Sequence, residues 1–396
     1  MADTAVVSPQ DADAPLIPPA EAEPVAISPP EAEAPLASPP VAVRDPWRDR
    51  RLVRAWLILV ALMIAGIVIV GGATRLTHSG LSITQWQPIH GVIPPLSDAD
   101  WQQEFAGYQQ IPEFKILNPT MTLGEFKGIF WWEWAHRLIA RLIGVVVLLP
   151  LVWLWWRGRI ERPLKVRIVA ILLLIGAQGA LGWWMVSSGL SVRTDVSQYL
   201  LAAHLTLACL ILSYTLWTAR GLAPSYTPSS APTRLGALII VALALLQIFM
   251  GGIVAGLDAG QGYNTWPLMN GALVPDGLYA LQPWWRSLFE NAMTAQFDHR
   301  LGAYTLFAAT LVYAFFTRNT AQATGAQRLA ILVLLQAVLG VATLINVVPV
   351  PLALAHQFGA IIVLSVAVTH LRGQLPPLPV RVSFATAEPT PAVAPA

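Results

Sequence analysis

The chain has 396 residues, of which 55% are hydrophobic and only 12% are charged, and its mean hydropathy is +0.58. About a quarter of the residues of a soluble globular protein are charged, so the composition excludes an ordinary soluble protein and predicts one that is integral to a membrane. The net charge of +2 is too small to indicate binding to nucleic acid.

The first 43 residues differ in composition from the rest of the chain. They repeat Pro, Ala, Glu and Ser, and they hold seven acidic residues and no Lys or Arg. Such a segment cannot bury enough apolar surface to offset its ordering entropy, so we predict a disordered tail over residues 1–47 and a second one over 374–396. The first tail lacks the basic start and apolar core of a signal peptide and is too acidic for a mitochondrial presequence, which favours a bacterial inner membrane over an organelle.

Eight stretches are long and apolar enough to cross a bilayer, which takes roughly 20 residues of helix. The single cysteine, Cys209, lies inside one of them, so neither a disulfide framework nor a thiolate metal site can be built. Long polar loops follow the first and the fifth stretch, and every other connection is short. We therefore predict an all-α membrane protein with eight transmembrane helices, near residues 52–72, 130–156, 166–187, 197–219, 234–256, 292–317, 327–348 and 352–371.

The basic residues predict the orientation of these helices. Sixteen of the 24 lie before the first stretch, in the loops after the second, fourth and sixth, after the eighth, or within the first three residues of the stretches that these segments precede. Because cytoplasmic loops carry the excess of Lys and Arg, both termini are expected in the cytoplasm and the two long loops outside.

Short motifs of the first half return in the second half. The halves would share one orientation, since four spans is an even number, and would form parallel repeats about an axis along the membrane normal. We predict two four-helix bundles, residues 48–222 and 223–373. The matching motifs are "GG" at 71–72 and 251–252, "WQPIHG" from 86 and "WPLMNG" from 266, "AHR" at 135–137 and "DHR" at 298–300, and "AQGALG" from 177 and "LQAVLG" from 335.

Four of the seven histidines fall on predicted spans, two in each half. The spans that hold them all run from outside to inside, and each histidine lies about four to seven residues into its span. A haem iron takes two axial imidazoles that face each other, and the interior of a four-helix bundle supplies that arrangement. The alternatives are helix-to-helix hydrogen bonds, or mononuclear metal sites, which would be poor in ligands. The four are His136, His204, His299 and His356.

Ionisable side chains accompany these histidines. Arg137 and Arg300 directly follow the first histidine of each half, and Arg141 lies one turn further. An arginine within a membrane is costly unless it is paired, and a haem propionate would be an apt partner. The alternative is an arginine that snorkels or that pairs with an Asp or Glu.

Glu133 is a carboxylate that only the first half carries. It lies one helical turn before His136, whereas Gln296 stands at the corresponding place before His299. A buried carboxylate is costly, so we expect it to serve chemistry, either as a proton acceptor or as a fixed charge. The alternative is that Glu133 only pairs with Arg137.

Three motifs resemble the haem A synthase family, in its long form from mitochondria and alphaproteobacteria. The resemblance extends from about residue 48 to 372 and leaves out the acidic tail. The motifs are "QQIPEFKILNPTMTLGEFKGIFWWEWAHR" (109–137), "GLDAGQGYNTWPLMNG" (256–271) and "LFENAMTAQFDHRLGAY" (288–304).

The resemblance implies an enzyme that oxidises the methyl group on carbon 8 of haem O to a formyl group, giving haem A for cytochrome c oxidase. It implies that His299 and His356, with Arg300, hold a resident b-type haem. His136 and His204, with Arg137, would bracket the substrate haem O, and Glu133 would be catalytic. The implied partners are a haem O synthase that delivers the substrate, an electron carrier of unknown identity and the lipid bilayer; a homo-oligomer is left open.

The chain departs from the family in one respect. Other members carry a cysteine pair in the first long loop, and this loop has none, so a redox role for such a pair cannot apply and the route of the electrons stays open. A pair of bis-histidine sites also suits a dihaem cytochrome b that relays electrons to or from a quinone, or a haem carrier without chemistry. Neither of these two alternatives explains Glu133.

Overall fold

The computed structural model describes residues 46–87 and 90–379. The first predicted disordered tail lies outside the described residues except for residues 46–47, which are helical, and the second except for 374–379. Disorder is the wrong prediction for 374–379, because Gln374 is buried and the backbone N–H of Leu378 donates to Gly221 at 2.8 Å. Within the described ranges every regular element is a helix, apart from an isolated bridge between Met269 and Ala272.

Eight of the helices are long and apolar enough to cross a membrane, counted over the described part of the chain. Each coincides with one of the eight predicted stretches, so the all-α membrane class is confirmed. The long helices are α1 (Pro46–Leu76), α4 (Leu123–Trp156), α5 (Arg162–Val192), α6 (Gln198–Gly221), α7 (Ala231–Gly256), α10 (Ala292–Thr317), α11 (Ala323–Ile345) and α12 (Val350–Arg372).

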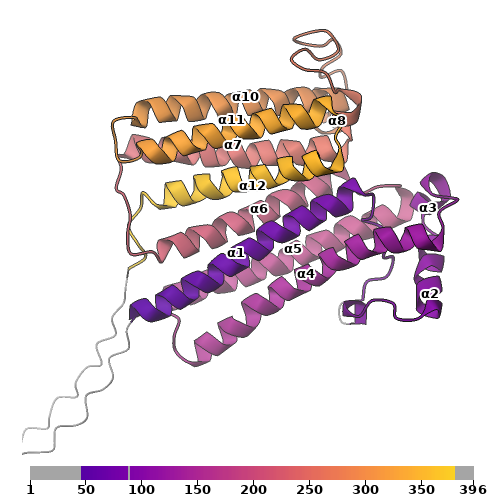
Figure 1. Cartoon of the computed structure of the whole chain (residues 1–396), viewed down its shortest axis with the longest axis horizontal. Helices are drawn as coiled ribbons and strands as arrows, with labels where there is room; N and C mark the ends of the chain where they lie inside the picture. Colours follow the sequence, from indigo (N-terminus) through magenta and orange to yellow (C-terminus); the bar gives the residue numbers. More distant parts are fainter. Residues whose placement is uncertain (1–45, 88–89, 380–396) are drawn as a thin grey trace, which may run out of the picture. The chain divides into compact units, whose positions relative to one another are not determined.

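The long loops contain short helices of their own. The first long loop, residues 77–122, holds η1 (His90–Val92), α2 (Asp98–Tyr108) and α3 (Pro112–Leu117). The second long loop, residues 257–291, holds α8 (Ala259–Gly262), η2 (Trp284–Arg286) and α9 (Ser287–Glu290). Both loops lie at the same end of the long helices, as the positions of α2, α3 and α8 show in Figure 1; we call this the long-loop end.

Helix α4 begins well before residue 130, where the apolar pattern predicted its start. Thr122 and Glu125 form a capping box, in which each side chain accepts from the backbone N–H of the other. The added turns bury Phe126 completely, among aromatic and apolar side chains of the first long loop. Hydropathy could not locate this start, because the extra turns pack on protein rather than on lipid.

The long helices pack in two rings of four. In the first half, α1 and α5 each contact both α4 and α6. In the second half, α7 and α11 each contact both α10 and α12. Helices α4 and α6 therefore stand at opposite corners of one ring, and α10 and α12 at opposite corners of the other. The relation of the halves as parallel repeats, and the domain boundaries near residues 48, 222 and 373, stay predictions.

The two rings join along α1, α6, α7 and α12, which lie side by side in Figure 1. Small residues allow this close approach: a Cβ on Gly252 would lie 2.9 Å from the Cα of Ala202. The amide of Gln357 also crosses the junction and donates to the backbone oxygen of Val68 at 2.7 Å. Arg75, in the last turn of α1, and Asp258, just after α7, form an ion pair at 2.8 Å.

Candidate functional site

The four predicted histidines lie on the four corner helices α4, α6, α10 and α12, each in the half of its helix nearest the long-loop end. All four side chains are only half-buried. The imidazoles of His136 and His204 are close enough for their charges to interact. The same holds for the imidazoles of His299 and His356. Each half of the protein thus brings two imidazoles together across a four-helix ring, although α4 begins further from its histidine than the other three helices do.

A glycine on a neighbouring helix lies against each of these rings. A Cβ on Gly71 would lie 2.7 Å from Cε1 of His136, and one on Gly182 would lie 2.9 Å from Cε1 of His204. In the second half, the corresponding distances are 3.2 Å from Gly251 to His299 and 2.8 Å from Gly340 to His356. Because real Cβ contacts are almost never below 3.0 Å, three of these glycines cannot be replaced without displacing an imidazole. The repeated motifs contain all four glycines. Their contacts with the imidazoles explain why a side chain does not fit at these positions.

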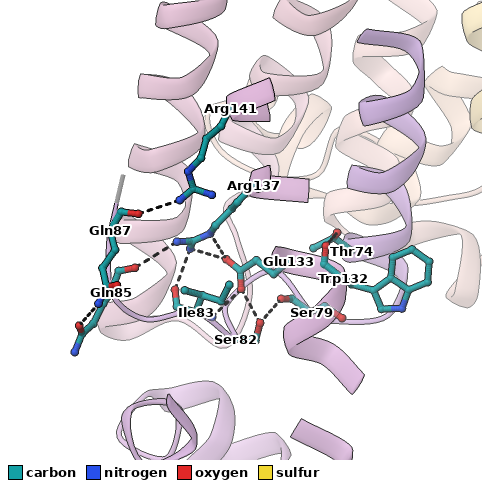
Figure 2. A network of polar contacts seen from close by, with 10 residues as sticks. All are labelled: Thr74, Ser79, Ser82, Ile83, Gln85, Gln87, Trp132, Glu133, Arg137 and Arg141. Atoms are coloured by element: carbon teal, nitrogen blue, oxygen red, sulfur yellow. Dashed lines mark hydrogen bonds and ion pairs between the residues drawn. The ribbon is translucent and has the colours of Figure 1, made fainter. Parts of the chain in front are cut away.

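Glu133 is held on α4 by four donors, as Figure 2 shows. Only 3% of its surface is exposed. Oε1 accepts from Nη2 of Arg137 at 2.6 Å and from Nε at 3.1 Å, one helical turn away. Oε2 accepts from the hydroxyl of Ser82 at 2.7 Å and from the backbone N–H of Ile83 at 2.8 Å. The sequence motif gave Glu133 and Arg137; it gave no signal for Ser82, which approaches from the first long loop.

Arg137 has further contacts with the same stretch of loop (Figure 2). Its Nη2 donates to the backbone oxygen of Ile83 at 2.9 Å, its Nη1 reaches that of Gln85 at 3.4 Å, and its guanidinium lies 5.7 Å from the ring centroid of Trp86. The ion pair with Glu133 that the sequence analysis gave as the alternative is thus present, and Arg137 is held in place by the protein itself.

The second half differs at both positions. Gln296 replaces the carboxylate and is buried, and its Oε1 has no hydrogen-bond partner among the described residues. Arg300 donates through Nη2 to the backbone oxygen of Tyr263 at 3.0 Å, but its buried Nε and Nη1 have no partner in the described part of the chain. Buried N–H groups of a cation without a partner are costly, so this arginine fits an anionic group such as a haem propionate beside His299.

A cavity of about 270 Å³ lies between the first long loop and α4. Arg137, Arg141 and Trp134 line it from α4, and Glu104 lines it from α2. Burial raises the pKa of Glu104, and the positive charge of Arg137 opposes that rise. The cavity thus lies beside Arg137, the ion-pair partner of Glu133.

A bare metal ion is a poor alternative to haem at these sites. Over residues 46–87 and 90–379, no three or more His, Cys, Asp or Glu side chains gather as a metal site would require. Two facing imidazoles and a buried arginine with free donors suit instead the iron and the propionates of a haem. The fold and the site together define a multi-pass helical membrane protein with two histidine pairs that suit haem.

Comparison with known proteins agrees with this class. The family model described as cytochrome oxidase assembly protein matches residues 54–368. The chain is 57% identical over 337 residues to haem A synthase of Rhizobium leguminosarum bv. trifolii, covering 84% of this chain and 92% of the relative. It is 58% identical over 330 residues to haem A synthase of Chelativorans sp., covering 82% and 91%, and 53% identical over 339 residues to that of Agrobacterium fabrum, covering 84% and 93%. The chain belongs to the haem A synthase family, which is a family of enzymes.

Proposed function

We propose that the protein is an oxidoreductase of the bacterial inner membrane that oxidises the C8 methyl group of haem O to a formyl group, producing haem A for cytochrome c oxidase. The identity to relatives named haem A synthase, over most of both chains, supports the reaction. The excess of basic residues in alternate loops supports cytoplasmic termini and an external long-loop end.

The resident cofactor of the proposal is a b-type haem in the second half. His299 and His356 would be its axial ligands, and the free Nε and Nη1 of Arg300 would bind a propionate. A bis-histidine haem supplies one-electron transfer. Gly251 and Gly340 keep the imidazoles close to the neighbouring helices, and Gln296 adds no charge there.

The substrate haem O would lie between His136 and His204 in the first half. With water as the source of the oxygen atom, each hydroxylation of the methyl group releases two electrons and two protons. The site therefore needs an electron carrier as a partner and a place for protons, which the cavity beside Arg137 and Glu104 offers. Delivery of haem O by a haem O synthase completes the set of partners.

The observation that carries the proposal is the difference between Glu133 and Gln296. Every contact of the Glu133 oxygens comes from a donor, which suits a carboxylate and not a carboxylic acid. Of the two roles considered for this residue, the contacts favour the fixed charge over the proton acceptor. A preorganised negative charge stabilises positive charge that develops on the substrate near its reacting methyl group.

A dihaem cytochrome b that relays electrons is the second candidate, because both halves present a pair of histidines. Extraction of the haems separates the two functions. The protein is expressed together with a source of haem O, the haems are extracted in acid acetone, and they are resolved by chromatography. We expect haem A or hydroxylated haem O beside haem B. Unchanged haem O in a preparation that keeps its resident haem would favour the electron relay.

A further inference from the structure

Two glutamines contact the imidazole rings of the second-half histidines. Nε2 of Gln247, on α7, lies 3.1 Å from Nδ1 and 3.3 Å from Nε2 of His299, and it donates to the backbone oxygen of the same residue at 2.9 Å. Nε2 of Gln336, on α11, lies 3.0 Å from Nδ1 of His356 and donates to its backbone oxygen at 2.8 Å. Each histidine is therefore held at both its ring and its backbone.

A glycine makes room for each glutamine. Gly302 and Gly359 stand three residues after the two histidines, and a Cβ on either would clash with Oε1 of the facing glutamine. The same two Oε1 atoms are buried and accept no hydrogen bond from the described residues. An imidazole that binds iron through Nε2 carries its proton on Nδ1 and needs an acceptor there. A turn of the amide that brings Oε1 to that proton gives up the hydrogen bond from Nε2 to the backbone oxygen of the histidine, so the amide holds either the protonated ring or the backbone.

The first half lacks this arrangement. Ile67 occupies the place of Gln247 in the repeated motif. Gln178 matches Gln336 and donates to the backbone oxygen of His204 at 2.9 Å, yet Nδ1 of that ring is buried without a partner among the described residues, as is Nδ1 of His136. The residues three positions after the first-half histidines are Ile139 and Leu207 rather than glycine.

We propose that Gln247 and Gln336 are positioning residues that fix the imidazoles of His299 and His356 through Nδ1, and that this contact distinguishes a permanently occupied haem site from an exchangeable one. The first-half rings, which lack the contact, are freer to release a haem after it has been modified. The inference rests on the proposed assignment of the resident haem to the second half.

Purified full-length variants without any haem O test this inference. Gln247→Met and Gln336→Met keep the side-chain volume and remove the amide. The haem-loss rate to apomyoglobin should rise by roughly 10–100-fold, the range for loss of an outer-shell partner of a metal ligand. The reduction midpoint of the haem should become more positive, because a ring without an acceptor at Nδ1 is a weaker donor to ferric iron. Gln336→Glu should move the midpoint in the opposite direction.

Two further variants make the result specific. Gly359→Ala keeps the glutamine but displaces its oxygen, and should also speed haem loss. Gln178→Met is the matched control in the first half and should leave both readouts of the resident haem unchanged. Unaltered loss rate and midpoint in both glutamine variants, or an equal change in Gln178→Met, would overturn the inference. If His299→Ala retains its full haem, the assignment of the resident haem fails instead, whichever way the glutamine variants behave.

Discussion

Replacing Glu133 by Gln gives the first half the residue type of Gln296 in the second half and removes one negative charge. The amide keeps the shape of the side chain but presents an N–H₂ group to one of the two donor pairs, Arg137 or Ser82 with Ile83. A buried hydrogen bond left unmade costs about 1–3 kcal/mol. Breaking a buried ion pair costs roughly 3–5 kcal/mol, and both side chains here are well buried, at 4% and 12% exposure. Arg137 keeps its two backbone acceptors, so we expect a loss of about 3 kcal/mol in folding stability, at the low end of that range.

The effect on the reaction should be larger than the effect on the fold. Loss of one preorganised electrostatic group typically lowers the rate by about 10²–10³-fold. The assay measures haem A and hydroxylated haem O per resident haem, so that any loss of folded protein is divided out. Gln296→Glu is the reciprocal control: it places a carboxylate in the half where no chemistry is proposed, and it should not restore product to the Glu133→Gln variant. Near-normal product from Glu133→Gln would show that Glu133 only anchors the loop and that the chemistry lies elsewhere.

Three further predictions concern topology, the first long loop and the glycines. Reporter fusions in either long loop should read as external and one in the loop between α6 and α7 as cytoplasmic; a cytoplasmic signal from a long loop would overturn the orientation. Burial raises the pKa of Glu113, on α3, from 4.5 to about 7, so the folded loop binds the proton more tightly than the unfolded chain and loses stability as the pH rises from about 5 to about 7. Glu113→Gln should abolish that dependence in hydrogen exchange of α2 and α3, and unchanged pH dependence would refute the cause. Gly182→Ala should displace His204 and lower conversion of haem O by about 10²-fold, whereas Gly179→Ala, which has nothing within 4 Å of its Cβ position, should not; equal activity of the two variants would refute the contact's importance.

Hydropathy predicts the eight long helices, and the spacing of the histidines predicts how they pair. A long apolar run has few alternatives to a spanning helix, which is why all eight helices were predicted near their observed places. The shared position of the histidines within alternate spans predicted two pairs, and the structure brings each pair together across its ring. Both predictions depend on features that are local in the sequence or periodic along it.

The contacts of Glu133 could not be predicted in the same way. Ser82 and Ile83 reach it from a loop about 50 residues earlier in the chain, and no local pattern determines where such a loop returns. The motifs do not distinguish the glutamines: "AQGALG" and "LQAVLG" carry Gln178 and Gln336 at matching positions, yet only Gln336 contacts the ring of its histidine.

The location of the chemistry in the first half can be measured directly. Purified protein with its resident haem is supplied with haem O and an electron acceptor, and the extracted haems are followed over time by chromatography and mass spectrometry. The wild-type protein should convert haem O to hydroxylated and formylated products. His136→Ala and His204→Ala should keep the low-spin spectrum of the resident haem and convert none. Conversion at the wild-type rate by either variant, or loss of the resident haem from both, would contradict the assignment of the substrate to the first half.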